Sequence, residues 1–205
     1  MTATAANGLA LMWEMLYIAS GMRLPIVLTV VNRSLSSPLN IHCDHSDSMG
    51  ARDSGWLQLY AETGQEAYDN TIQAVRIAEH PDLLTPVMSC QDGFITGHGV
   101  ERVGILPDQA VKEFVSTYEP KYWLLDTDHP VTMGAWDFTD YYFEHKRQQS
   151  EAMNNALPIV EAISKEYEEL SGRPQPILDM YGMDDADYAI IVLSSTAGTS
   201  RAVAR

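Results

Sequence analysis

Short runs of apolar residues along the chain predict strands that are buried on both faces. Residues 26–31, IVLTVV, follow Pro25 and are rich in β-branched side chains, and residues 86–90 form a second run of this kind. Strands that are apolar throughout are typical of parallel sheets covered by helices on both faces. Residues 56–60 are expected to add a shorter strand. The pattern therefore favours a buried parallel sheet.

Between these runs, apolar residues recur every three or four positions, a spacing typical of helices. The first helix is expected to begin at Asn7, as its N-cap, and to stop at Gly21. Its apolar positions are Leu9, Met12, Trp13, Leu16 and Tyr17. Further helices are predicted over residues 65–79, 108–117 and 145–170.

The alternation of strands and helices predicts an α/β fold with a doubly wound, mainly parallel sheet. We expect residues 1–118 to form this domain, and residues 119–187 to hold a crossing segment, the long helix and a linker. Pro158 is expected to break the long helix. Residues 188–205 are predicted to begin a further domain, with a buried strand over 188–193 and then a helix.

The predicted elements at the two ends lack partners. A strand and one short helix cannot bury a core, and no strand is predicted before the first helix. We therefore expect the 205 residues to be an internal piece of a longer subunit, incomplete at both ends.

Composition narrows the possible functions. The formal net charge of −15 argues against nucleic acid or an anionic membrane as a partner, because both require a basic patch. Cys43 and Cys90 are the only cysteines, too few for an iron–sulfur cluster and typical of a reducing cytoplasm. Residues 1–21 lack a basic start and contain Glu14, so they favour neither a signal peptide nor a membrane span.

The densest group of polar residues directly follows the first buried strand. Between Asn32 and Trp56 the chain gathers Arg33, His42, Asp44, His45, Asp47, Arg52 and Asp53. In open α/β sheets, ligands bind beyond the carboxyl ends of parallel strands, so this segment is the candidate site. Arg33 could present its guanidinium to a carboxylate or phosphate, or pair instead with Asp44 or Asp47.

The cluster of His42, Asp44, His45 and Asp47 leaves three interpretations open. Imidazole and carboxylate together suit zinc, iron or manganese, although the spacing matches no standard metal motif. The same side chains could form a hydrogen-bonded network that orders the loop, or the histidines could act as general acid or base. No dinucleotide-binding or P-loop glycine motif is present.

Four stretches of the chain, residues 7–33, 40–56, 65–79 and 87–98, resemble a known family. The most specific are DHSDSMGARDSGW, residues 44–56, and CQDGFIT, residues 90–96. They resemble the pyrimidine-binding region of the alpha subunit in the 2-oxoacid:ferredoxin oxidoreductases, above all the pyruvate:ferredoxin oxidoreductases (pyruvate synthases). Residues 145–157 and 185–203 resemble the continuation into a transketolase-C-terminal-like domain.

The resemblance implies a fold of the thiamine-diphosphate-binding type and a role in the cytoplasm. The family converts pyruvate, coenzyme A and oxidised ferredoxin into acetyl-CoA, carbon dioxide and reduced ferredoxin. It implies that this chain supplies the pyrimidine side of the thiamine diphosphate site. The magnesium ion and the iron–sulfur clusters are implied to lie in other subunits of the complex.

The resemblance also implies roles for individual residues. Arg33 is the expected catalytic residue and binds the substrate carboxylate, with Asn32 beside it. The residues expected to line the site or order its loop are Asp44, His45, Asp47, Arg52 and Asp53. No metal ligand is implied within this chain.

The chain departs from the family at its beginning. The glutamate that activates the cofactor and a threonine near the substrate lie upstream of this helix in the family, outside the 205 residues. Residues 4–8, TAANG, replace the family's usual Ser-Ser-Gln-Gly type of lead. We therefore expect the chain to be inactive alone. Two rival hypotheses are a non-catalytic assembly module and a metal-dependent enzyme that uses residues 42–47.

Overall fold

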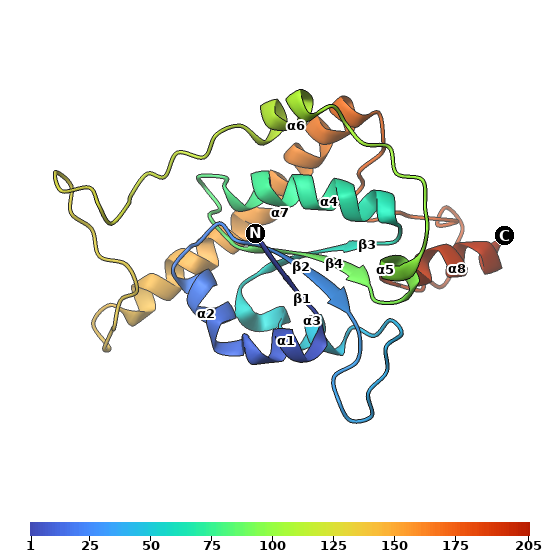
Figure 1. The fold of residues 1–205 in the computed structure, drawn as a ribbon, viewed down its shortest axis with the longest axis horizontal. Helices are drawn as coiled ribbons and strands as arrows, with labels where there is room; N and C mark the ends of the chain where they lie inside the picture. The colour runs from blue at the N-terminus through green and yellow to red at the C-terminus, as the bar shows by residue number, and fades with distance from the viewer.

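Four parallel strands form the centre of the molecule in a computed structural model that describes residues 1–205. They are β1 (Thr2–Thr4), β2 (Val27–Asn32), β3 (Leu57–Ala61) and β4 (Val87–Asp92). Their order in the sheet is β1-β2-β4-β3, so β2 and β4 are central (Figure 1). This confirms the predicted α/β fold and the three predicted strands, each displaced by one or two residues.

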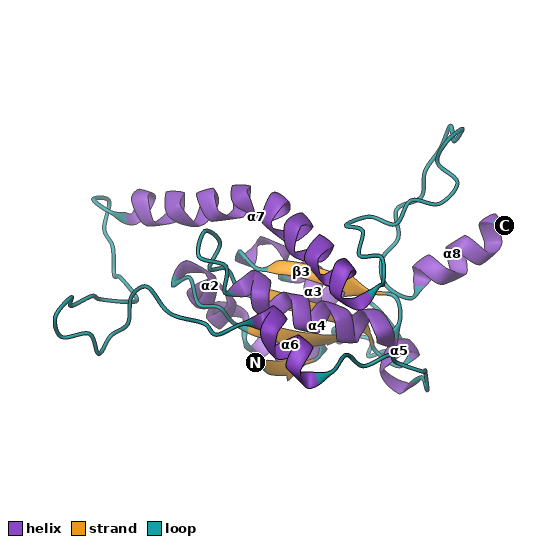
Figure 2. Cartoon of the chain, turned by 90° about the horizontal axis from the view of Figure 1, so that it is seen from above, coloured by secondary structure: helices purple, strands orange, loops and turns teal.

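Helices cover both faces of the sheet, as Figures 1 and 2 show. One face carries α4 (Gly64–Ala78), α6 (Asp108–Val115) and the long α7 (Tyr142–Ser171). The other carries α1 (Ala6–Leu11), α2 (Trp13–Gly21) and α3 (Ser46–Gly50). Two short helices complete the set, α5 (Ile95–His98) and α8 (Thr196–Ala204), at the end toward which the strands point.

Alternate residues of each central strand belong to different cores. Val27 and Val87 pack beneath α4 and α7, in a cluster with Ile77, Leu83 and Tyr167. Successive strand residues point to opposite faces, so their neighbours enter the other core. That second core contains Leu9, Leu16, Leu28, Val30, Trp56, Met88 and Cys90. Both faces of β2 and β4 are therefore buried, which explains their continuous apolar runs.

The beginning of the chain corrects the predicted first helix. A short strand, β1, precedes the helix and pairs with β2, from Thr2 opposite Leu28 to Thr4 opposite Val30. The helix itself is interrupted at Met12, and Asn7 lies inside α1 rather than capping it. Three residues, two of them threonine, give too weak a pattern to reveal β1.

The predicted long helix continues through Pro158. α7 runs unbroken from Tyr142 to Ser171, so the expected break is wrong. Its buried side includes Ala156, Val160 and Ile163, which lie on both sides of the proline and pack in the α4 core. We infer that this packing outweighs the local cost of the missing amide donor, which is about 3 kcal/mol in a helix interior.

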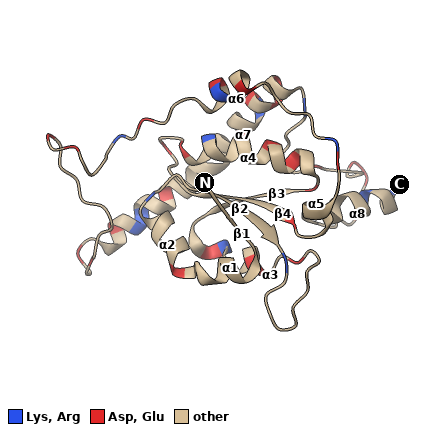
Figure 3. Ribbon diagram, viewed as in Figure 1, with Lys and Arg blue, Asp and Glu red and all other residues tan.

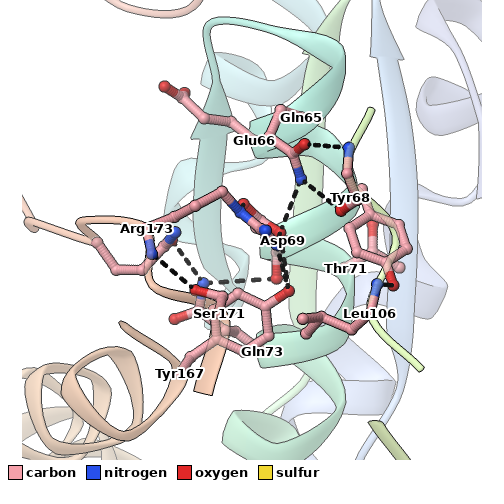
Figure 4. A network of polar contacts seen from close by, with 12 residues as sticks. Gln65, Glu66, Tyr68, Asp69, Thr71, Gln73, Leu106, Tyr167, Ser171 and Arg173 are labelled. Atoms are coloured by element: carbon pink, nitrogen blue, oxygen red, sulfur yellow. Dashed lines mark hydrogen bonds and ion pairs between the residues drawn. The ribbon is translucent and has the colours of Figure 1, made fainter. Parts of the chain in front are cut away.

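A network of polar contacts fixes the end of α7 against α4 (Figure 4). The carboxylate of Asp69, only 1% exposed, accepts hydrogen bonds from the Tyr167 hydroxyl at 2.7 Å and from Arg173 Nε at 2.9 Å. Gln65 donates to the same carboxylate at 3.1 Å and accepts from the Gly104 amide at 2.6 Å. Residues 100–107 thus follow α4 without forming a strand.

Two other segments are largely exposed. Residues 119–141 extend away from the body of the molecule, and Leu125 and Trp136 in this segment are each 88% exposed. The strand predicted over residues 188–193 is wrong, because no strand forms there and Tyr188 is 94% exposed. The helix predicted after it is confirmed as α8. The assignment of residues 188–205 to a further domain stays a prediction.

Charged residues lie almost entirely outside the strands. Figure 3 shows them spread over the helices and connecting segments. Among the strand residues only Asp92 carries a charge. None of the helices is both long enough and apolar enough to span a membrane.

Candidate active site at the carboxyl edge of the sheet

The carboxyl ends of β2 and β4 lie side by side because the strands are parallel and in register. Asn32, the last residue of β2, stands opposite Asp92, the last residue of β4. The amide of Gly93 donates to the Asn32 carbonyl at 2.8 Å. A Cβ atom on Gly93 would lie 2.6 Å from that oxygen, so only glycine permits this approach. The chain between Asn32 and α3 leaves from this edge (Figure 1).

Asp47 is the centre of the hydrogen bonding at this edge. It belongs to the first turn of α3 and is 2% exposed. Its Oδ1 accepts from Asn32 Nδ2 at 2.8 Å, and its Oδ2 accepts from the main-chain amide of Ala6 at 3.1 Å. Oδ2 also accepts from the main-chain amide of Arg33, at 3.3 Å. One carboxylate therefore joins the ends of β1 and β2 to α3.

Asn32 is fully buried, which changes its predicted role. Its amide nitrogen donates to Asp47 and to Ser48 Oγ, the latter at 2.8 Å. The Ser48 hydroxyl also accepts from the Tyr60 hydroxyl at 2.9 Å, and burial raises the pKa of Tyr60. Because Asn32 is 0% exposed, the structure places it where it supports the strand end rather than where it meets solvent.

His45 and Asp92 form an ion pair at the same edge. His45 Nε2 lies 2.9 Å from Asp92 Oδ1, and Asp92 is 0% exposed. The hydrogen bond to Asp92 raises the pKa of His45 above its ordinary value, although partial burial opposes this. Burial also opposes ionisation of Asp92, but hydrogen bonds from His45 and Ser195 outweigh it and lower the pKa of that carboxyl. The pair is therefore favoured in its charged form.

The same aspartate binds the end of the chain. Asp92 Oδ2 accepts a hydrogen bond from the Ser195 amide at 2.9 Å and another from the Ser195 hydroxyl. Close by, Arg201 of α8 pairs with Glu62, which follows β3, at 3.2 Å. These contacts attach the start of α8 to the carboxyl edge.

Arg33 forms no ion pair in the structure. Its main-chain amide is held by Asp47, while its guanidinium donates only to the Ser34 carbonyl, at 3.4 Å. Asp44 instead accepts from the Ser46 amide at 2.7 Å. The alternative in which the Arg33 guanidinium pairs with Asp44 or Asp47 is therefore wrong, and this cation remains available at the edge of the sheet.

The metal-binding interpretation of residues 42–47 is not supported by where the side chains lie. His42 contacts Asn40, at 3.1 Å, and the ring of Phe94. His45 points to Asp92, while Asp47 binds amide donors. No three side chains of His, Cys, Asp or Glu converge as a ligand group. The interpretation as a hydrogen-bonded network describes His45 and Asp47 correctly.

Arg52 and Asp53 lie away from this network. They belong to a short 3-10 helix, η1 (Arg52–Ser54), which precedes β3 and so lies at the opposite, amino end of that strand. Both side chains are largely exposed and approach each other at 3.7 Å. The structure thus separates them from Arg33, because α3 and η1 carry the chain away from the carboxyl edge, and their assignment to the site stays a prediction.

Sequence reasoning missed Asp92, Tyr60 and Ser195 as members of the site. Asp92 carried a usable signal, since it is a charged residue two positions after the strand predicted over 86–90, and the structure shows it as the last residue of β4. Tyr60 likewise lies next to the end of its strand. Ser195 carried none, because its contact depends on how a distant segment returns to the sheet.

The fold defines the class as an α/β domain with a parallel sheet, and its polar edge lies where ligands bind in such folds. Comparison with known families gives a more particular result. The family model described as "Pyruvate flavodoxin/ferredoxin oxidoreductase, thiamine diP-bdg" matches residues 1–165. The chain belongs to this family of pyruvate flavodoxin/ferredoxin oxidoreductases.

Similar curated proteins carry consistent names. "Pyruvate synthase subunit PorA" of Thermotoga maritima is 59% identical over 203 residues, which are 99% of this chain and 52% of that protein. The protein of the same name from Methanocaldococcus jannaschii is 48% identical over 98% of this chain and 52% of its own length. "Ketoisovalerate oxidoreductase subunit VorA" of Pyrococcus horikoshii is 37% identical over 97% of this chain and 50% of its own.

The chain spans about half the length of the curated relatives that it matches. The matched half contains the whole of the carboxyl edge described above.

Proposed function

We propose that this chain forms one side of the thiamine diphosphate site of a pyruvate:ferredoxin oxidoreductase, and that Arg33 binds the carboxylate of pyruvate. The names of the relatives support the reaction, and the family description supports the cofactor. Pyruvate is favoured over branched 2-oxo acids because the two pyruvate synthase subunits are more similar to this chain than the ketoisovalerate subunit is.

The proposal rests mainly on the observation that the Arg33 guanidinium forms no ion pair within the chain. A guanidinium presents a planar fork of donors that matches a carboxylate, and such pairs are often bidentate. Arg33 follows the central strand β2 directly and has no acidic partner. It can therefore bind and orient a 2-oxo acid by its carboxylate end.

The residues at this edge suit the pyrimidine end of thiamine diphosphate better than its diphosphate. The edge offers polar side chains and rings, among them Tyr60 and His45, whose rings meet edge to face with centroids 5.5 Å apart. It also holds Asn32 Oδ1, a buried acceptor without a partner. The bound cofactor would supply the electron sink for decarboxylation. No cluster of carboxylates forms that could bind the magnesium ion of the diphosphate.

We therefore propose that magnesium and the iron–sulfur clusters are held by partner subunits. Cys90 is buried in the core, and Cys43 lies in the loop after β2, so neither can complete a cluster that needs four thiolates. Coenzyme A, ferredoxin and the activating glutamate would likewise meet this site only in the assembled complex. A complex that uses ferredoxin and two unpaired cysteines fits a cytoplasmic location.

The substitution Arg33→Ala in the complete enzyme complex tests the proposal. Loss of a buried charge-assisted pair costs on the order of 2–5 kcal/mol, so kcat/KM for pyruvate is expected to fall about 30- to 5,000-fold. Arg33→Lys keeps the charge but loses the fork, and is expected to recover only part of the loss. An unchanged KM and kcat would show that Arg33 does not bind the substrate.

The rival hypothesis of a non-catalytic assembly module gives a different result. In that case the complex would form with this chain, yet neither Arg33 variant would alter turnover. Normal assembly of the Arg33→Ala complex, combined with the expected loss of activity, excludes it.

A further inference from the structure

Asp47 is a buried carboxylate that no cation neutralises. It takes part in none of the ion pairs of the chain, although it is 2% exposed. A buried charge is costly unless hydrogen bonds satisfy it. Four N–H donors do so here, and three of them are main-chain amides, those of Ala6, Arg33 and Ser48.

The contact with Arg33 determines what its side chain can do. Asp47 Oδ2 binds the main-chain amide of Arg33 and leaves the guanidinium alone. An aspartate this close in sequence could have paired with the guanidinium, and a charged pair of that kind would compete with any anionic ligand. The geometry instead fixes the backbone from which the side chain extends and keeps the cation free.

The same oxygen also binds the turn between β1 and α1. Oδ2 accepts from Ala6, a fully buried residue with a φ of 33°, a left-handed conformation that is unusual for a residue other than glycine. Asp47 thus holds the ends of β1 and β2 in one arrangement. A change in this contact would move the Arg33 backbone relative to the neighbouring strand.

We infer that Asp47 is a positioning residue, which sets the place of Arg33 and keeps its guanidinium available for a substrate carboxylate. This inference rests on the proposed function, because it assumes that Arg33 binds the substrate. Asp47 would therefore influence the affinity for the substrate only through its effect on the position of Arg33.

The substitution Asp47→Asn separates this role from simple packing. Asparagine has nearly the same shape, but its amide nitrogen can only donate. Whichever way the amide is turned, two of the four donors around Asp47 lose their acceptor. Asp82→Asn is the matched control, since Asp82 lies exposed on the surface after α4.

The experiment is a double-mutant cycle in the full-length protein within its complete complex. It compares Arg33→Ala, Asp47→Asn and the double variant by KM and kcat for pyruvate. We expect Asp47→Asn to raise KM about tenfold or more with a smaller change in kcat, and the double variant to be no worse than Arg33→Ala. Asp82→Asn is expected to match the wild type.

A second measurement does not depend on turnover. Phenylglyoxal modifies free guanidinium groups, and mass spectrometry reports the modification of the peptide that contains Arg33. Pyruvate is expected to protect Arg33 in the wild type and in Asp82→Asn, and to lose most of that protection in Asp47→Asn. If the asparagine variant does not fold, Asp47→Glu enters the same cycle, because it keeps both acceptor oxygens but displaces them.

The outcomes distinguish the inference from the proposal on which it rests. If Arg33→Ala leaves KM unchanged and pyruvate does not protect Arg33 in the wild type, the proposed function fails. If Arg33→Ala raises KM but the Asp47 variant does not, the positioning role alone is overturned. It is equally overturned if the effects of the two substitutions add, because Asp47 would then act independently of Arg33.

Discussion

Two buried aspartates, Asp69 and Asp47, are satisfied in opposite ways. Asp69 belongs to α4 and faces the end of α7, where it binds Arg173 through two nitrogens, with Tyr167 as a further donor (Figure 4). Asp47 lies at the carboxyl edge and binds only uncharged N–H groups. Their exposed fractions are nearly equal, 1% and 2%, so burial does not explain the difference.

The difference shows how one kind of residue can serve structure or function. At Asp69 the Arg173 guanidinium is bound through two of its nitrogens, and the hydrogen bond to Asp69 raises the pKa of Arg173. At Asp47 the nearest arginine keeps its guanidinium free. A third buried aspartate, Asp92, lies between these cases, because its partner His45 is a cation only when protonated. We therefore expect substitutions at the three aspartates to change stability and substrate affinity differently, and only the Asp92 site to depend on pH near neutrality.

The largest loss of stability is expected when the ion pair between Asp69 and Arg173 is broken. Asp69→Ala leaves the Arg173 guanidinium and the Tyr167 hydroxyl without their acceptor, so the free energy of unfolding should fall by about 3–5 kcal/mol. Urea denaturation of the chain measures this loss. In the complete complex, KM for pyruvate should stay near the wild-type value. A rise in KM with little loss of stability would contradict the division between the two aspartates.

A smaller, pH-dependent effect is expected at His45 and Asp92. The pKa of His45 is raised on folding, so its contribution is complete below its ordinary value of 6.5 and is lost as the pH rises through the folded pKa. The pKa of Asp92 is lowered, so its contribution is complete above 3.8 and is lost as the pH falls through the folded pKa. The pair should therefore stabilise the fold most between these two values.

The substitution His45→Gln tests this window. Compared with the wild type, it should lower the free energy of unfolding by about 1 kcal/mol near pH 5.5, and by less near pH 9. An equal loss at both values would show that the charge of His45 is unimportant. NMR titration provides a direct check, since Asp92→Asn should lower the pKa of His45.

A similarly small effect is expected from Tyr167→Phe. It removes one donor from Asp69 but leaves Arg173 and Gln65 in place, so the unfolding free energy should fall by about 0.5–1.5 kcal/mol. The Phe114 ring packs edge to face on Tyr167 with centroids 5.2 Å apart, and this contact is retained. A loss as large as that of Asp69→Ala would mean that the hydroxyl, and not the ion pair, holds α7 in place.

The pattern of apolar residues predicted most of the fold, because a strand that is buried on both faces requires a continuous apolar run. The runs over 26–31 and 86–90 became β2 and β4, and the helix predicted over 65–79 became α4 within one residue at each end. The run over 188–193 has the same apolar character, yet it forms no strand and has no neighbour to pair with. An apolar run predicts a strand only where a partner strand is present.

The site was only partly predictable for a related reason. Arg33 could be found because it follows a strand, and that position is local information. Asp92 required the register that sets it opposite Asn32, and Ser195 required a contact across 103 residues of sequence. The structure separates Arg52 and Asp53 from Arg33, so closeness in sequence did not correspond to closeness in space.

The long sequence separation of these contacts has a consequence for synthesis on the ribosome. Every partner of Asp47 precedes it or follows it directly in the chain, so its network can close as soon as α3 has emerged. Asp92 cannot bind Ser195 until 103 further residues have been synthesised, and Asp69 cannot bind Arg173 until 104 further residues have been synthesised. At typical translation rates this delay lasts roughly 5–20 s. The Arg33 side of the edge would thus form first in the nascent chain, before α8 arrives to join it.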